Sequence, residues 1–168
     1  LLASNEILKK NILNEANKKK INTTKIIFLE KTDLPTHLSR HTLADLFLDS
    51  FNCNAHTSAV DSLWAGLPIL TKVGNSFASR ICASLLKYFE LNSLITYTKD
   101  EYFKKAIELA TNPEKYKEIK NQVIMAKVSE KYFDTKKYTY NLEKAYKKIH
   151  HNRITDNKFE NVFINEDE

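Results

Sequence analysis

A cluster of polar side chains follows a short apolar run in the first half of the chain. Its members all carry hydrogen-bond donors or acceptors: Asn54, His56, Thr57 and Ser58. Thr57 or Ser58 is suited to cap a helix. The first amides of a helix lack intrahelical partners and lie at the positive end of its dipole, so this position favours an anion such as phosphate. Asp61, one turn further on, would present a carboxylate to ribose hydroxyls.

Structural roles are the alternative for the same residues. Polar runs before helices often only cap them, and a single histidine such as His56 is commonly a structural residue. The pattern alone therefore leaves both interpretations open.

The elements around this cluster are those of a parallel α/β unit. Residues 46–49 form a short apolar run typical of a strand that is covered on both faces. A helix is expected from about Ala59 to Ala65, with Val60, Leu63 and Trp64 packed on the sheet. Gly66 would end this helix, and residues 68–70 open the next strand. Ligands of open α/β sheets bind at the carboxyl edge of the strands, where the polar cluster would lie.

The rest of the chain fits a Rossmann-like lobe. Periodicity and capping residues predict helices and strands in the following order: helix 5–20, strand 25–29, helix 37–44, helix 75–88, strand 94–96, helix 100–110, helix 112–127 and a helix from 134 to about 149. In the helix 37–44, His37 and Arg40 lie three residues apart and can face one ligand. The final helix carries an apolar stripe and would need a partner surface to cover it.

Several short segments resemble the donor-binding lobe of the O-linked N-acetylglucosamine transferases, including the plant SPINDLY branch and bacterial homologues with tetratricopeptide repeats. The matching segments, in order, are 37–40, 43–45, 48–49, 53–54, 56–58, 61, 63–68 and 78–80. A looser similarity covers most of residues 25–150. The resemblance implies an α/β fold, namely the Rossmann-like C-terminal lobe of a GT-B glycosyltransferase, a three-layer α/β/α structure with extra C-terminal helices.

Site roles follow from the same resemblance. In these transferases the residue matching His37 lies against uracil, the one matching Arg40 helps to hold the base, and the one matching Asp61 binds the ribose. The segment 56–58 holds the diphosphate, with Ser58 in place of a usual threonine. The resemblance thus implies six UDP-sugar contacts: His37, Arg40, His56, Thr57, Ser58 and Asp61.

The sequence departs from the family at two places. Leu34 stands where the family often has a ribose-binding lysine, for which the nearby Lys31 is a candidate substitute. The glutamine and lysine that reach the donor phosphates in the family would lie before Leu1. Catalytic residues are therefore left unassigned.

A chain of 168 residues is long enough for one lobe but not for a two-lobed transferase. We expect residues 1–150 to be a nucleotide-sugar-binding lobe that is truncated at its N-terminal side, entered at a strand end in residues 1–4. Residues 151–168 are expected to be a flexible tail. The missing N-terminal catalytic lobe and repeat domain would then be partners, and this chain alone would be an inactive fragment.

Charge and composition exclude several other classes. The net charge is +5, and the acidic last 18 residues leave +8 on residues 1–150 from 24 basic and 16 acidic residues. The lysines lie in helices with apolar opposite faces, so solvated faces are favoured over nucleic-acid binding. Two cysteines and two glycines provide no zinc spacing, disulfide framework or glycine-rich nucleotide loop. No membrane span or signal segment is seen, so a cytoplasmic protein is expected.

The sequence therefore predicts the donor-binding lobe of an inverting, metal-independent glycosyltransferase without a cofactor. The resemblance implies UDP-N-acetylglucosamine as donor and a protein Ser or Thr hydroxyl as acceptor. A non-catalytic UDP-sugar-binding module is the alternative.

Overall fold

Helices outnumber strands in the computed structural model of the chain, which describes residues 5–129, 133–155, 157 and 159–165. The elements follow one another in this order: α1 (Glu6–Lys18), η1 (Thr23–Lys25), α2 (Leu34–His41), β1 (Phe47–Leu48), α3 (Thr57–Trp64), β2 (Ile69–Lys72), α4 (Ile81–Tyr88), η2 (Asn92–Leu94), β3 (Ile95–Thr96), α5 (Lys99–Thr111), α6 (Pro113–Val128) and α7 (Thr135–Thr155). The strand end expected at residues 1–4 lies outside the described residues, as do positions 156, 158 and 166–168 of the expected tail.

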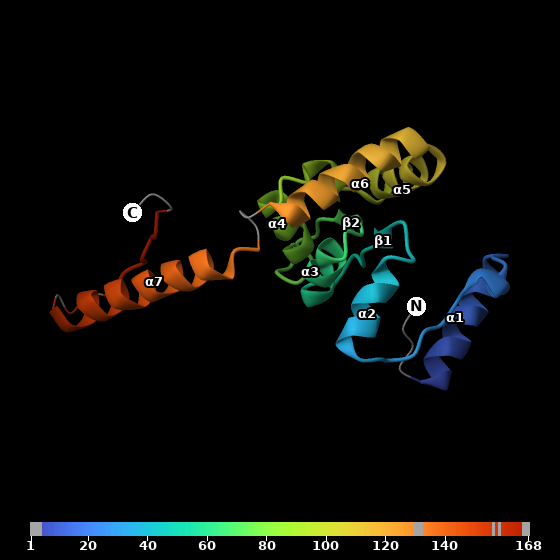
Figure 1. Ribbon diagram of the computed structural model, residues 1–168. Helices are drawn as coiled ribbons and strands as arrows, with labels where there is room; N and C mark the ends of the chain where they lie inside the picture. The colour runs from blue at the N-terminus through green and yellow to red at the C-terminus, as the bar shows by residue number, and fades with distance from the viewer. Residues whose placement is uncertain (1–4, 130–132, 156, 158, 166–168) are drawn as a thin grey trace.

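The three strands form one parallel sheet in the order β1-β2-β3. Phe47 pairs with Ile69, and Thr71 pairs with Ile95. Helix α3 connects β1 to β2, as Figure 1 shows, and α4 and η2 follow β2 before β3. Helix-linked parallel strands bring all the loops that follow the strands to one edge. The α/β class predicted from the sequence is confirmed.

The core lies between this sheet and the helices α3 to α6. Its members are apolar and almost inaccessible to solvent: Ala59, Leu63, Ile69, Cys82, Leu86, Phe89, Leu91, Leu94, Leu109, Ile119, Val123 and Ala126. Both α5 and α6 contribute to it, so these helices belong to the same folded unit as the sheet. Full burial of one such leucine contributes roughly 1.5–3 kcal/mol relative to exposure.

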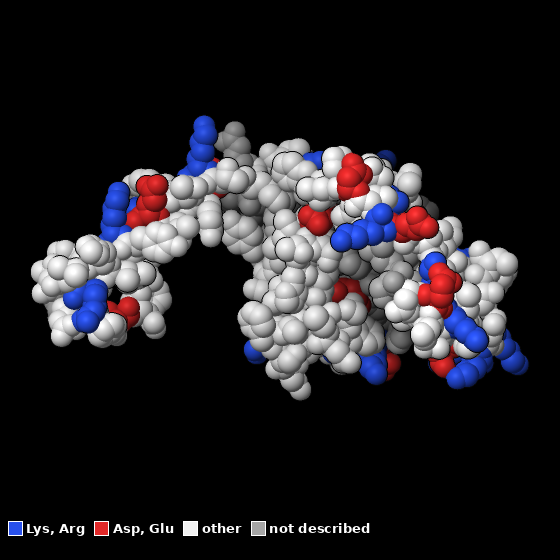
Figure 2. Space-filling view, turned by 90° about the horizontal axis from the view of Figure 1, so that it is seen from below, with Lys and Arg blue, Asp and Glu red and all other residues white. Residues whose placement is uncertain are grey.

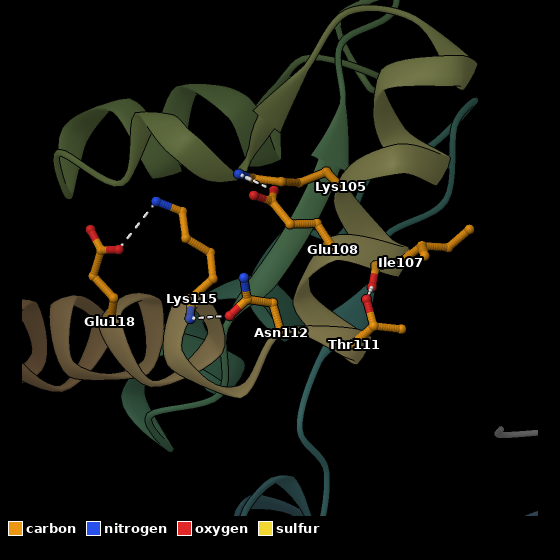
Figure 3. A network of polar contacts seen from close by, with 7 residues as sticks. All are labelled: Lys105, Ile107, Glu108, Thr111, Asn112, Lys115 and Glu118. Atoms are coloured by element: carbon orange, nitrogen blue, oxygen red, sulfur yellow. Dashed lines mark hydrogen bonds and ion pairs between the residues drawn. The ribbon is translucent and has the colours of Figure 1, made fainter.

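Local signals explain the start and end points of several helices. The Asn5 side chain accepts a hydrogen bond from the Leu8 amide at 2.8 Å, as expected for the cap of α1. Asn112 caps α6 in the same way through the Lys115 amide at 3.0 Å. Figure 3 shows this cap beside the Lys105–Glu108 ion pair of α5, in which the lysine lowers the pKa of the Glu108 carboxyl. These caps satisfy amides that no helical carbonyl reaches.

Some predicted boundaries are wrong. Lys25 ends the 3₁₀ helix η1, residues 26–28 are extended chain with Ile27 68% exposed, and Leu29 forms a single β-bridge, so residues 25–29 are not a strand. A strand needs a neighbour to accept its hydrogen bonds, and this segment does not join the sheet. Helix α4 begins at Ile81 rather than near residue 75, because residues 75–80 form a turn closed by the bond from the Ser79 amide to the Ser76 carbonyl.

The buried faces of two helices also differ from the sequence prediction. In α3, Val60 and Trp64 are 38% and 46% exposed instead of packed on the sheet, and Leu63 is buried together with Ala59. Trp64 lies edge to face against Phe133, with ring centroids 5.0 Å apart. The indole therefore contacts the residue that lies just before α7 rather than the sheet.

Helix α7 extends away from the rest of the molecule in Figure 1, and none of its residues is buried. Its predicted apolar stripe is exposed at Tyr138 (68%) and Ile149 (51%), while Leu142 and Ala145 are half-buried. The helix continues to Thr155, so the segment that was expected to be a tail from residue 151 begins as helix. Among the described residues, no helix combines the length and hydropathy needed to cross a lipid bilayer.

Candidate functional site

The polar cluster identified in the sequence opens α3 at the carboxyl edge of the sheet. His56 is the residue that caps the helix, with φ of −107° and ψ of −97°, and its side chain makes no capping hydrogen bond. The prediction that Thr57 or Ser58 is the cap is therefore wrong, because both lie in the first turn of α3. Within the described part of the chain, no acceptor binds the amides of Thr57 and Ser58. These amides remain available to an anion.

His37 and Asp61 meet where α2 packs against α3. The distance from His37 Nε2 to Asp61 Oδ2 is 3.9 Å, and each side chain retains about a third of its exposure, 33% and 32%. Asp61 follows Thr57 by one helical turn, so the imidazole, the carboxylate and the free amides lie close to one another. The structure thus brings together residues 24 positions apart in the sequence as one polar, solvent-accessible surface.

Two further residues of α2, Arg40 and His41, make contacts that fix the surroundings of His37. Arg40 donates a hydrogen bond from Nη1 to the Glu30 carbonyl at 2.6 Å, so its guanidinium holds the segment before α2. His41, which the sequence analysis did not select, packs its ring edge to face on His37, with centroids 4.8 Å apart. Its Nδ1 lies 3.0 Å from the His37 carbonyl. Because His41 packs on one side of His37, it restricts the orientation of that ring.

Leu34, where the resemblance is broken, and Lys31, the candidate substitute, both precede His37. Leu34 is the first residue of α2 and is 61% exposed, and Lys31 is exposed as well. The structure records no polar contact of Lys31 with a described residue, so its role as a substitute for the family lysine stays a prediction.

Asp49 organises the loop that leads into α3, and the sequence analysis gave it no role. Its Oδ1 accepts hydrogen bonds from the amides of Ser50 (2.9 Å) and Ala55 (2.7 Å). Its Oδ2 accepts one from Thr71 Oγ1 of β2 at 2.6 Å. The side chain is 4% exposed. An acidic residue directly after an apolar run was the available signal for such a clamp. The expectation that this run is a strand covered on both faces is wrong, because β1 is at the edge of the sheet and Leu48 is 55% exposed.

Two protonated groups surround this clamp. Burial and the Asp49 carboxylate raise the pKa of the Cys82 thiol to about 12, and the same two causes raise that of the Tyr102 phenol to about 12. The Tyr102 hydroxyl donates to the Asp49 carbonyl at 3.1 Å. Neither group acts as a base at neutral pH, so they support the loop rather than carry out chemistry.

The arrangement suits recognition of a phosphorylated ligand with hydroxyl groups. The amides at the start of α3 can donate to phosphate oxygens, and Asp61 can accept from a diol. The His37 ring offers a flat surface for a base. No cluster of three metal-binding side chains is found among residues 5–129, 133–155, 157 and 159–165.

Comparison with known proteins identifies the family. The family model described as "Glycosyl transferase family 41" matches residues 1–142. This chain belongs to glycosyl transferase family 41. The family includes the transferases that the sequence segments resemble, so the recognition made from those segments is confirmed.

Curated relatives of this family 41 chain carry names of N-acetylglucosaminyltransferases. The Caenorhabditis elegans UDP-N-acetylglucosamine--peptide N-acetylglucosaminyltransferase is 33% identical over 123 residues, which is 73% of this chain and 11% of that protein. The probable enzyme SEC of Arabidopsis thaliana is 34% identical over 125 residues, 74% of this chain and 13% of its own length. The probable SPINDLY enzyme of Hordeum vulgare is 30% identical over 115 residues. The chain thus spans a small part of these relatives.

A solved structure supports the fold of this family 41 chain. A mutant of the Thermobaculum terrenum O-GlcNAc transferase superimposes with a TM-score of 0.84 over 94% of this chain and 31% of that one, at 20% sequence identity. The fold is therefore that of part of a GT-B transferase.

Proposed function

We propose that this chain is the donor-binding lobe of an inverting glycosyltransferase that transfers N-acetylglucosamine from UDP to Ser or Thr of proteins. One observation carries the proposal: His37 and Asp61 meet 3.9 Å apart beside the unpaired amides of Thr57 and Ser58. The names of the relatives supply the donor and the peptide acceptor of this proposal. The companion lobe and the acceptor-activating base would be outside the residues assigned here.

Each group has a distinct part in the proposed reaction. Uracil lies against the His37 ring, the ribose hydroxyls donate to Asp61, and the diphosphate lies over the start of α3. The acceptor oxygen forms a bond to the anomeric carbon from the face opposite UDP, and the bond from that carbon to the diphosphate oxygen breaks. UDP leaves with the electron pair, and the hydroxyl proton passes to a base.

We propose that the leaving group is stabilised without a metal ion. The helix dipole and the amides of Thr57 and Ser58 are donors directed at the charge that grows on the diphosphate. The hydroxyls of the same two side chains can add further hydrogen bonds. We also propose a reducing compartment such as the cytoplasm, in keeping with the unpaired Cys53 and Cys82.

Calorimetric titration of UDP into the full-length protein tests the proposal. Asp61→Ala and His37→Ala should each weaken UDP affinity about tenfold or more, because each removes a direct contact worth roughly 1–2 kcal/mol. His150→Ala and Asp100→Ala, at exposed positions on α7 and α5, are the matched controls and should keep wild-type affinity. Equal affinity of Asp61→Ala and wild type would refute the assignment.

A further inference from the structure

A second polar hollow lies beside the donor site and has no role in the scheme above. Its volume is about 540 Å³. The lining residues come from the loops that follow the three strands: Phe51, Asn52, Lys72, Val73, Gly74, Asn75, Ser76, Ser79 and Tyr97. None of them is acidic, and most offer hydroxyl, amide or ammonium groups.

The loop that forms one wall is tightly closed. The Gly74 amide donates to the Ser79 carbonyl at 2.8 Å, and the Ser76 and Ser79 hydroxyls lie 2.9 Å apart. A Cβ on Gly74 would stand 2.3 Å from Ser79 Oγ, so only glycine permits this approach. The wall is therefore a built feature of the fold and not a loose surface loop.

One lysine, Lys72, lines the hollow, and a second, Lys99, lies near the Phe51 ring that forms part of its lining. The ammonium groups of Lys72 and Lys99 lie 5.6 and 5.9 Å from the centroid of the Phe51 ring, which places both on the same aromatic side chain. Lys72 donates one hydrogen bond to the Val73 carbonyl at 2.8 Å, and an ammonium has three protons, so donors remain for a ligand. Two ammonium groups near one side chain make this edge of the hollow favourable for an anion.

The hollow adjoins the donor site through one short loop. Phe51 and Asn52 line the hollow, and the same loop reaches His56 at the start of α3. Asp49 fixes this loop at its beginning and at Ala55. A polypeptide whose hydroxyl reaches the donor can therefore pass over the hollow within a few residues, since extended chain spans about 3.3 Å per residue.

We propose that this hollow binds an anionic side chain, a carboxylate or a phosphate, of the protein acceptor close to the hydroxyl that is modified. This inference rests on the proposed function, which supplies the protein acceptor. Lys72 and Lys99 pair with the anion, and the Ser76 hydroxyl and the Asn52 amide are donors within the same hollow. Acceptors with an acidic residue near the modified Ser or Thr are thereby favoured.

Fluorescence anisotropy of labelled peptides with the full-length protein and saturating UDP tests this proposal. Three peptides share one sequence with a single acceptor serine and differ at one nearby position, which is Glu, phosphoserine or Gln. The acidic peptides should bind more tightly than the Gln peptide. In the Lys72→Gln/Lys99→Gln variant the ratio of the affinity for the acidic peptides to the affinity for the Gln peptide should fall about tenfold, since two partly exposed charge contacts are lost.

The matched control is Lys10→Gln/Lys117→Gln, which removes the same charge from exposed positions on α1 and α6 and should keep the preference. Preference for the Glu or for the phosphoserine peptide supports the proposal and identifies the anion. Equal binding of all three peptides, or an unchanged preference in the hollow variant, overturns it. UDP titration of the wild type and of each variant tests the proposed function separately from the peptide preference. Loss of UDP binding in the wild type would contradict the proposed function and not the preference of the hollow for an anion.

Discussion

At the scale of single residues, the carboxylate of Asp49 connects the elements around the site. Its oxygens satisfy two amides of the loop before α3 and the hydroxyl of Thr71, and its own carbonyl accepts from Tyr102. The Thr96 hydroxyl adds a further hydrogen bond to this network by donating to the Thr71 carbonyl at 2.8 Å. A buried acceptor with all its donors in place fixes a loop geometry that apolar packing alone leaves free. The start of α3 is thereby held in a shape ready for a ligand.

Titration of the neighbouring Cys82 predicts loss of stability at alkaline pH. Its pKa rises from 9.0 to about 12 in the folded protein. Below pH 9 the Cys82 thiol is protonated in both the folded and the unfolded protein, so its contribution to the free energy of unfolding is complete. Between pH 9 and 12 only the thiol of the unfolded protein ionises, so the free energy of unfolding falls. Urea denaturation at pH 8 and pH 10 should record this fall, and Cys82→Ala should reduce it.

Cys53→Ala, at an exposed position, is the matched control and should retain the wild-type dependence on pH. Tyr102 contributes in the same direction above pH 10 because its pKa is also raised. A pH dependence that is identical in Cys82→Ala and wild type would contradict the assignment.

At the scale of elements, the chain turns from α3 into β2 at Gly66. This glycine has φ of 77°, in the left-handed region, and its amide donates to the Leu63 carbonyl at 3.0 Å. The Leu67 amide donates to the Ser62 carbonyl at 2.8 Å, and Ser62 Oγ returns a bond to the Leu67 carbonyl at 3.0 Å. The turn therefore sets where α3 ends and where the core strand begins.

Gly66→Ala should lower the free energy of unfolding by about 1–2 kcal/mol, the cost of a left-handed alanine. A Cβ there would lie 3.8 Å from Ile124, an ordinary contact, so the cost is in the backbone rather than in a clash. Gly66→Asn should lose less, because asparagine tolerates this conformation. Urea denaturation of both variants distinguishes these outcomes, and equal loss in the two would argue against a backbone origin.

At the scale of the whole molecule, helix α7 differs from the sheet and the helices α3 to α6 because it contributes no buried residue to the core. Phe133 packs between Trp64 and Phe89, with centroid distances of 5.0 and 5.2 Å, so contact with the core ends just before α7. Seen from below in Figure 2, both signs of charge are interspersed at the α1 end and charged side chains are sparse over the middle. This face carries no continuous basic surface of the kind nucleic-acid binding requires. That the apolar stripe of α7 needs a partner surface stays a prediction.

Truncation after Asp134 should change the free energy of unfolding by less than about 1 kcal/mol, because burial of apolar surface is the main source of stability and α7 buries no residue. Urea denaturation of the full and truncated chains measures the difference. The matched substitution Phe133→Ala should cost more, roughly 2–4 kcal/mol, since it removes a ring that packs on the core. A larger decrease in the free energy of unfolding on truncation than on Phe133→Ala would refute the claim that α7 adds little to the stability of the core.

The sequence by itself determined the alternation of strands and helices from β1 onward and the segment that opens α3. Asn5, Gly66 and the Asn112–Pro113 pair marked helix ends correctly because caps and turns depend on residues within about four positions of each other. The resemblance placed the candidate ligand contacts on α2 and α3, and the structure brings His37 and Asp61 of that set together.

Only the tertiary structure decided which faces are buried and how the loop before α3 is held. Helix α5 shows its regularly spaced Phe103 and Ile107 to solvent, at 57% and 63% exposure, and buries Tyr102 and Leu109 instead. Tyr102 reaches Asp49, 53 residues away in the sequence. Local periodicity reports an apolar stripe but not its partner, and burial is settled by contacts between segments that are distant in the chain.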